Sequence, residues 1–104
     1  MSTARELLAC FGRSTLVRLI HERGLAPVRK NDDRRKTLAR SYRGDVEALI
    51  NDLNRAELVG IFRQLTFFVG DEAVYLPNPG KYRLDELRAF GIRAFAGRRV
   101  RHPG

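Results

Sequence analysis

Apolar residues recur along most of the chain at spacings of three and four, which is the pattern of helices that bury one face. The pattern predicts a first helix that is capped by Ser2 or Thr3 and runs through Phe11. A second helix is expected to begin after a cap at Ser14. It should end at Gly24, because glycine tolerates the left-handed conformation that often closes a helix.

Three further helices follow along the chain. Residues 26–33 are expected to form an extended loop, because Pro27 is disfavoured within a helix and residues 31–33 can cap the next one. A third helix is predicted at about residues 33–42, and a fourth begins after a cap at Asp45. Asn54 and Glu57 have the spacing of a capping box, the clearest boundary signal in the sequence, and they predict the start of a fifth helix.

The pattern after the fifth helix is that of strands. Residues 67–69 and 73–76 predict two short strands around a turn. Because a two-stranded ribbon is only marginally stable alone, we expect it to lie on the helices. A loop at residues 77–80 leads to a last helix at about residues 84–90. The chain from Gly91 onward is expected to be irregular and to end in a basic stretch.

One long stretch of the sequence, residues 7–25, occurs again in degenerate form as residues 49–67, at a shift of 42. The shift places Leu16 on Leu58 and Arg13 on Arg55. Amphipathic helices share apolar positions by chance, but an unbroken register over this whole stretch favours a duplicated unit. A unit of this period cannot bury its apolar face alone. We therefore expect the two stretches to superpose as helix–turn–helix pairs.

The predicted fold is mainly α, with one domain at residues 1–104 that consists of two helix–extension–helix-like units. Unit one is expected at about residues 3–43. Unit two, with the short two-stranded β-ribbon, is expected at about residues 44–92, before a basic tail at residues 93–104. A longer protein that continues beyond Gly104 is one interpretation of this tail. The side chains expected in the core are Leu16, Leu19, Ile20, Leu49, Leu58, Ile61 and Phe62.

The charge of the chain narrows its function. It has 20 Lys and Arg against 12 Asp and Glu, a net charge of +8 over 104 residues. Such an imbalance in a small domain favours a polyanionic partner, with nucleic acid first. The alternative is a soluble surface from an arginine-rich genome. Cys10 is the only cysteine, which argues against a disulfide framework or a thiolate zinc site. We expect a cytoplasmic protein with no signal peptide or membrane span.

The basic residues are densest between Arg29 and Arg43, where seven of them accompany only Asp32 and Asp33. A basic helix behind an extended loop can offer guanidinium and amide N–H groups to phosphates, which gives affinity without sequence readout. The alternative is a solvated helix face. The residues expected to bind nucleic acid are Arg29, Lys30, Arg34, Arg35, Lys36 and Arg40, with Lys81 and Arg83 repeating the role in unit two.

A spacing of leucines, glycine and basic residues connects these observations to a family. The residues that carry it are Leu16, Leu19, Gly24 and Leu25, then Lys36, Leu38 and Arg40, and in unit two Gly80, Lys81 and Leu84. This spacing resembles the SAP domain and its helix–extension–helix relatives, with one extra residue before Gly24 and no glycine before Lys36. A rival alignment pairs residues 42–45 with residues 82–85. The resemblance implies a small DNA-binding module attached to an enzyme that acts on nucleic acid.

The sequence does not favour catalysis. The two histidines are far from Cys10 in the sequence, and no phosphate-cradling loop, nucleophile elbow or metal-ligand spacing is present. We therefore expect no enzyme activity, no cofactor, no metal and no membrane partner. The favoured function is non-catalytic nucleic-acid binding, DNA before RNA, accessory to a larger enzyme. The alternative is a protein–protein docking module that uses the ribbon and exposed aromatic residues. Tyr75 and Tyr82 are candidates for stacking on bases, with packing against the last helix as the alternative.

Overall fold

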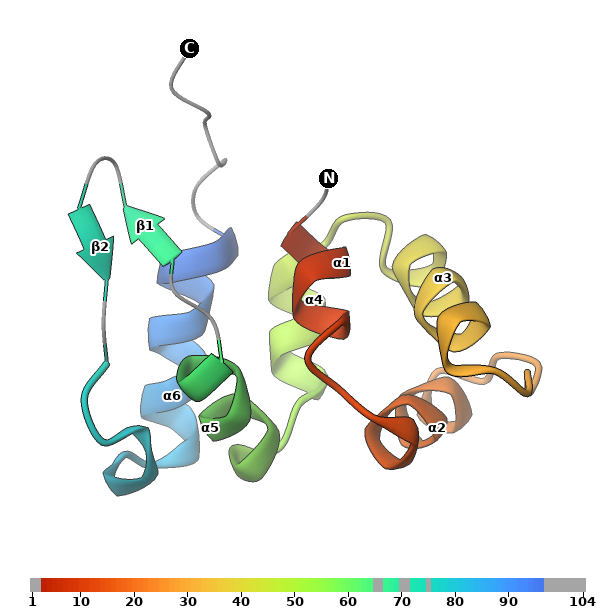
Figure 1. The fold of residues 1–104 in the computed structure, drawn as a ribbon, viewed down its shortest axis with the longest axis horizontal. Helices are drawn as coiled ribbons and strands as arrows, with labels where there is room; N and C mark the ends of the chain where they lie inside the picture. Colours follow the sequence, from red (N-terminus) through yellow and green to blue (C-terminus); the bar gives the residue numbers. More distant parts are fainter. Residues whose placement is uncertain (1–2, 65–66, 70–71, 75, 97–104) are drawn as a thin grey trace, which may run out of the picture. The chain divides into compact units, whose positions relative to one another are not determined.

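The computed structural model describes residues 3–64, 67–69, 72–74 and 76–96, and Figure 1 shows the fold. The chain forms two compact units, Met1–Asp45 and Val46–Gly104. The described residues are mainly helical and contain six α-helices. No helix among them is both long enough and apolar enough to cross a membrane.

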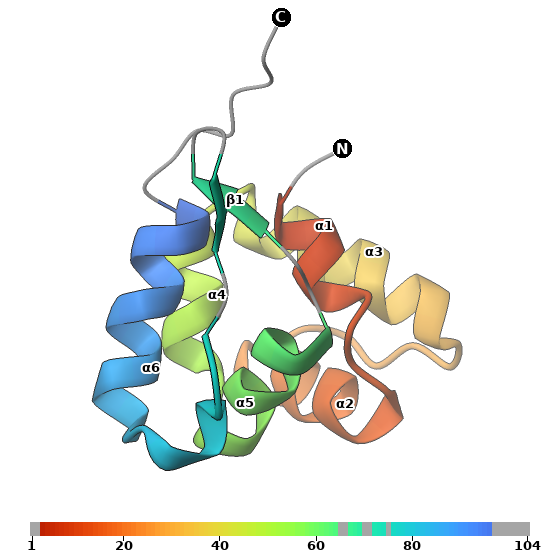
Figure 2. The ribbon, with the colours of Figure 1, turned by 60° about the vertical axis from the view of Figure 1, so that its left-hand side comes forward.

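The first unit is a group of three helices, α1 (Thr3–Leu8), α2 (Arg13–Glu22) and α3 (Asn31–Tyr42). Helix α3 packs on both α1 and α2 (Figures 1 and 2). This arrangement buries the apolar stripe of each helix, as its spacing requires. The buried apolar side chains of this unit are Ala4, Leu7, Leu8, Phe11, Leu16, Leu19, Ile20, Leu38 and Tyr42.

The start of this unit differs from the prediction in two places. Helix α1 ends at Leu8, because Cys10 and Phe11 donate to carbonyls three residues back and tighten the chain into a turn before Gly12. Helix α2 then begins at Arg13, with Gly12 as its N-cap residue and no side-chain cap bond. The predictions of a helix through Phe11 and of a cap at Ser14 were therefore wrong.

The end of α2 confirms the role predicted for Gly24. This residue has a φ of +69°, and its N–H donates to the carbonyl of His21 at 3.0 Å. The N–H of Leu25 donates to the carbonyl of Ile20 at 3.0 Å. These two bonds form a Schellman motif, which satisfies carbonyls that the helix itself cannot pair.

Helix α3 begins earlier than the sequence indicated. Its N-cap residue is Lys30, in an extended conformation, so the helix starts at Asn31 and not at Asp33. The acidic residues 32 and 33 lie in its first turn, where they interact favourably with the helix dipole and do not act as the cap. The helix closes on Arg43, which has a φ of +52°, and Gly44 follows with a φ of +78°.

The second unit contains α4 (Val46–Asp52), α5 (Arg55–Gln64) and α6 (Leu84–Gly91), with a 3₁₀ turn at Pro79–Lys81 before α6. Helix α6 packs on α4 and α5. The predicted capping box is confirmed, because the backbone N–H of Asn54 and that of Glu57 each donate to the other's side chain at 2.9 Å. The buried apolar side chains here are Val46, Leu49, Ile50, Leu53, Leu58, Val59, Ile61, Phe62, Leu87, Ala94 and Phe95.

The β-ribbon in the predicted fold class needs correction. The unit is built by its helices, and the second extended segment does not have the predicted bounds of residues 73–76. Its extended pairing is limited to three residues on each side, β1 (Phe67–Val69) and β2 (Glu72–Val74), in antiparallel register. Three residues on each side form too few hydrogen bonds to make an independent structural element. The second extended segment therefore begins one residue earlier than predicted, at Glu72.

The end of the second unit also differs from the prediction. We expected irregular structure from Gly91, but α6 passes into a π-helical turn at Ile92–Ala96. Two of its side chains, Ala94 and Phe95, are buried, and the ring of Phe95 stacks on that of Phe62 at 6.1 Å. This aromatic packing stabilises the helical continuation that local sequence signals did not indicate.

One helix of each repeated stretch follows the shift of 42, whereas the ends of α1 (Leu8) and α4 (Asp52) do not. Helices α2 and α5 begin and end at equivalent positions, and a break precedes each. The hydrogen bonds in the breaks are equivalent too, since Phe11 donates to Leu8 at 3.2 Å and Leu53 donates to Ile50 at 3.1 Å. The rival alignment is not supported by the helices, because Tyr42 ends α3 whereas Tyr82 precedes α6. The superposition of the two stretches stays a prediction.

All seven predicted core side chains are buried, and Leu58 is the most informative one to change. Leu58→Ala should lower the free energy of unfolding by about 2–5 kcal/mol, because it leaves a cavity in a packed interior. Val17→Ala is the control, since Val17 is an apolar helix residue whose side chain lies on the surface (39% exposed). Urea unfolding followed by circular dichroism measures both. Equal stability of the two variants would contradict the assigned core.

The left-handed conformation of Gly24 gives a second test. A Cβ at this position would meet no atom within 4 Å, so any cost of substitution comes from the backbone alone. Gly24→Ala should destabilise the protein by about 1–2 kcal/mol, and Gly24→Asn should cost less because asparagine tolerates this conformation. Thermal unfolding compares the two variants. An alanine variant as stable as the wild type would show that the Schellman motif is not maintained in solution.

Candidate nucleic-acid interface

The positive charge of the chain is unevenly divided between the two units. The first unit has eleven Lys and Arg against five Asp and Glu, a net charge of +6. The second has nine against seven, a net charge of +2. A polyanion would therefore be attracted mainly to the first unit.

Four of the predicted binding residues form an exposed group around the start and middle of α3. Arg29 and Lys30 lie in the extended segment before the helix, and Lys36 and Arg40 lie on the helix itself. Lys36 and Arg40 are four residues apart, so their side chains lie on the same side of α3. We call these four residues the α3 basic group.

Arg34 does not belong to this group. The structure buries it (7% exposed), and its Nη1 donates to the Asn31 side-chain oxygen at 2.7 Å. The reason is helical geometry, because Arg34, Leu38 and Tyr42 follow one another at intervals of four on the inner side of α3. The structure therefore does not place Arg34 on the exposed surface that a nucleic-acid-binding residue needs.

Arg35 is half-buried and has a structural role that the sequence did not indicate. Its Nε donates to the carbonyl of Leu8 at 3.3 Å, and its Nη2 donates to the carbonyl of Phe11 at 2.8 Å. The first of these carbonyls ends α1, and the second lies in the turn after it. Arg35 therefore supplies a donor to the carbonyl of Phe11 and a second donor to that of Leu8, which also accepts from the N–H of Phe11, and it attaches α3 to α1. Its Nη1 also forms an ion pair with Asp32 at 3.2 Å.

The two predicted residues of the second unit have local partners. Lys81 is exposed, with its Nζ 5.6 Å from the centre of the Tyr82 ring. Arg83 forms ion pairs with Asp85 at 3.4 Å and with Glu86 at 3.9 Å, so two carboxylates offset its charge. Lys81 and Arg83 therefore do not form a second group of exposed cations like the α3 basic group.

Other arginines also bond to backbone carbonyls. In the second unit, Arg88 donates to Leu53 at 3.0 Å, and Arg55 donates to Tyr82 at 2.9 Å and to Gly80. In the first unit, Arg23 donates to the carbonyl of Ser41 at 3.4 Å and to its hydroxyl at 2.8 Å. The guanidinium of Arg23 lies 3.8 Å from the centre of the Tyr42 ring. No local sequence signal separates these arginines from those on the surface, because their acceptors lie 18 to 35 residues away.

A cleft of about 320 Å³ lies in the first unit between α1 and α3. Its lining residues are Arg5, Ala9, Asp32, Arg35 and Lys36. Three of these five side chains are cationic, and Lys36 also belongs to the α3 basic group. The sequence did not predict the cleft or the place of Arg5 in it, since residues 5 and 35 meet only through the packing of α1 on α3.

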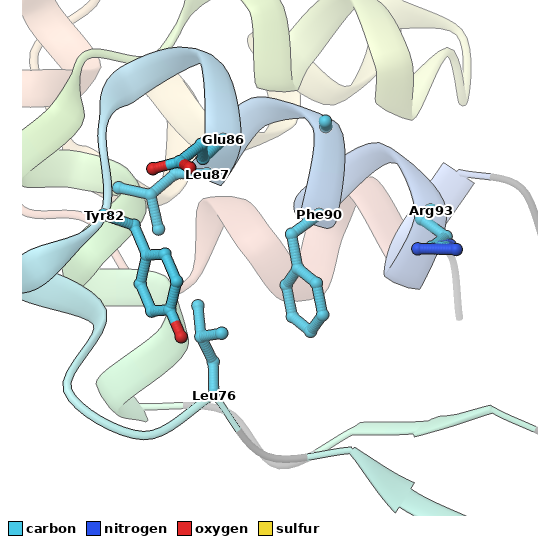
Figure 3. A pocket seen from close by; sticks show the side chains of 7 residues that line it. Leu76, Tyr82, Glu86, Leu87, Phe90 and Arg93 are labelled. Carbon is cyan, nitrogen blue, oxygen red and sulfur yellow. The ribbon is translucent and has the colours of Figure 1, made fainter.

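The second unit has a hollow of different chemistry, about 490 Å³ in volume, beside α6 (Figure 3). Leu76, Tyr82, Leu87 and Phe90 give it a mainly apolar lining, and Glu86 and Arg93 also contribute. Tyr82 is half-buried and lines this hollow. That placement agrees with packing near the last helix and gives no support to stacking on bases. Tyr75 lies outside the described residues, as does the basic stretch after residue 96.

The described residues contain no cluster of three or more His, Cys, Asp or Glu side chains that could hold a metal ion. Cys10 is partly buried, and its thiol lies 3.7 Å from the carbonyl of Glu6. Burial raises the pKa of the Cys10 thiol, because the thiolate loses solvation. A raised pKa lowers the thiolate fraction at neutral pH and makes the group a poor nucleophile.

Comparison with protein families, with curated proteins and with solved structures finds no match for this chain. The resemblance to the SAP domain accordingly stays a prediction.

The structural role of Arg35 can be separated from its charge. Arg35→Gln should lower the free energy of unfolding by about 1–3 kcal/mol, because the carbonyls of Leu8 and Phe11 lose a charged donor. Lys36→Gln removes the same charge from the next, exposed position and should change stability by less than about 0.5 kcal/mol. Chemical unfolding of both variants is the measurement. If both variants lower the free energy of unfolding by the same amount, the bonds of Arg35 do not stabilise α1.

The burial of Cys10 predicts slow alkylation. In the native protein at pH 8, iodoacetamide should modify Cys10 more slowly than it modifies the urea-unfolded chain, because the raised pKa and the burial both reduce access to the thiolate. Mass spectrometry of timed samples gives the two rates. The rate of alkylation should rise with pH in both states. It should level off at a higher pH in the native protein than in the unfolded chain, because the native thiol has the higher pKa. Equal rates at pH 8 would contradict the burial.

Proposed function

We propose that this protein binds nucleic acid without catalysis, through the backbone phosphates, and that the first unit carries the contacts. The observation that carries the proposal is the α3 basic group, whose four exposed cations lie in a unit of net charge +6. Phosphate contacts by such groups give affinity and orientation but little sequence preference.

The backbone at the start of α3 supports the same proposal. Lys30 is extended and makes no side-chain cap bond to the helix, and α3 is twelve residues long. A phosphate near Lys30 would therefore meet two cationic side chains together with N–H groups of the first helical turn. The acidic residues of that turn oppose an anion there, so the cations of the group must supply most of the attraction.

The set of binding residues is narrower than the sequence suggested. Arg34 is buried, and Arg35 bonds backbone carbonyls, so we no longer assign them to the open basic surface. Lys81 and Arg83 have local partners and are left out of the proposal. DNA is favoured over RNA, and an accessory role beside a larger enzyme is favoured, because the SAP-like spacing implies both. The cytoplasm is the favoured compartment, because a single cysteine argues against a disulfide framework.

The test is a salt titration of binding to a fluorescent DNA duplex, measured by anisotropy. Four phosphate contacts should give a slope of log K against log salt of roughly −3.6, since each contact contributes about −0.9. Lys36→Gln with Arg40→Gln should flatten the slope by about 1.8 and lower affinity equally on unrelated sequences.

The matched control is Arg63→Gln with Arg93→Gln. Both of these arginines are exposed in the second unit, and the pair removes the same total charge. The control should leave the slope unchanged. An equal loss of DNA affinity in both double variants would contradict the assignment of the contacts to the first unit, because only the net charge of the protein would then determine binding. No binding of the wild type to DNA or RNA at low salt would overturn the proposal and would favour the alternative of protein–protein docking.

A further inference from the structure

The cleft between α1 and α3 contains a guanidinium that is fixed in place before any ligand arrives. Two carbonyls, those of Leu8 and Phe11, hold Arg35 at 3.3 and 2.8 Å, and its side chain is still 30% exposed. An arginine that is already oriented loses little side-chain entropy when it binds an anion.

The guanidinium of Arg35 keeps donors for a ligand. It has five N–H groups. Three of them are used among the described residues, two by the carbonyls and one by Asp32. The contact with Asp32 is an exposed ion pair of 3.2 Å, and the carboxylate is 86% exposed. Such a pair is weak, so a stronger anion can replace it.

The other residues of the cleft strengthen its attraction for an anion. Arg5 from α1 and Lys36 from α3 both line it, so two elements bring three cations around one hollow. Asp32 is the only acidic residue of the lining. Its carboxylate occupies the edge of Arg35 on which a phosphate oxygen would be bound.

We propose that this cleft binds one backbone phosphate of the nucleic acid, with Arg35 as its fixed donor, and that Asp32 competes with that phosphate for Arg35. The proposal rests on the function proposed above and adds a particular site to it. It gives Arg35 two roles, because the bonds that attach α3 to α1 also orient the ligand-binding edge. The intrinsic affinity of the cleft is therefore greater than the wild-type chain displays.

Two acidic residues of the same helical turn allow a matched test. Asp32 and Asp33 are both exposed and both lie in the first turn of α3, but only Asp32 lines the cleft and pairs with Arg35. Asp32→Asn and Asp33→Asn change the net charge equally. Asp32→Asn should raise the affinity for a 5′-hydroxyl duplex by about two- to fivefold more than Asp33→Asn does, which is the range of one exposed ion pair.

The salt slope adds a second measurement. If a phosphate enters the cleft once Asp32 is neutral, the slope for Asp32→Asn should steepen by up to about 0.9, whereas Asp33→Asn should leave it unchanged. Equal affinities and equal slopes for the two variants would overturn the proposal. The proposal would also be overturned if Asp32→Asn raised affinity only for a duplex with a 5′-phosphate, because the cleft would then bind a strand end and not a backbone phosphate.

A cation of the cleft provides the complementary test. In the Asp32→Asn protein, Arg5→Gln should lower affinity at least threefold more than Arg13→Gln does, because both arginines are exposed in the first unit but only Arg5 lines the cleft. Equal losses of affinity in the two variants would overturn the assignment of a phosphate to this cleft. If the wild type binds duplex with the salt dependence carried by Lys36 and Arg40 while these comparisons fail, only the cleft assignment is wrong. If the wild type does not bind, the proposed function fails as well.

Discussion

An arginine on the third helix of each unit donates to a backbone carbonyl in the turn that joins the first two helices. In the first unit Arg35 bonds the carbonyl of Phe11 at 2.8 Å, and in the second Arg88 bonds that of Leu53 at 3.0 Å. The two acceptors are equivalent positions of the repeated stretch, separated by 42 residues. Short helices leave many carbonyls unpaired at their ends, and each of these bonds supplies a charged donor where one is needed.

This interaction determines how the remaining structure can pack. Helix α1 has only six residues and α4 has seven, too few to be stable alone in water. Each lies in a unit whose third helix contacts it, and that helix supplies both the apolar surface and the guanidinium. Arginine suits this role because its planar fork can bond more than one carbonyl while its charge remains partly solvated. The proposed phosphate site uses the same property, since Arg35 keeps N–H donors beside those that bond the carbonyls.

The basic residues therefore fall into two kinds, those that bond backbone carbonyls and those that lie on the surface. Some arginines bond carbonyls and stabilise the fold, whereas the α3 basic group has no such role in the structure and lies in contact with solvent. Net charge alone does not distinguish the two kinds of residue. A guanidinium bound to neutral carbonyls keeps its charge, so structural arginines still contribute to the field around the first unit. In the proposed function, the exposed ones would move to meet successive phosphates.

The sequence by itself determined the helical class and the buried faces of α2, α4 and α5. Spacings of three and four are a direct consequence of helix geometry, so the predicted core side chains are buried. Local chemistry also determined two boundaries. The bonds between Asn54 and Glu57 and the positive φ of Gly24 depend on residues that are neighbours in the chain.

Tertiary structure decided the features that depend on residues far apart in the sequence. The pattern of charges gave no sign that Arg34 is buried, or that Arg35 would be held by carbonyls more than twenty residues away. The helical turn after Gly91 depends on Phe95 packing against Phe62, and the cleft exists only because α1 lies on α3. A side chain's own neighbours in the chain specify its helix, but the direction and partners of a long, flexible arginine depend on which carbonyls the packed helices bring within its reach.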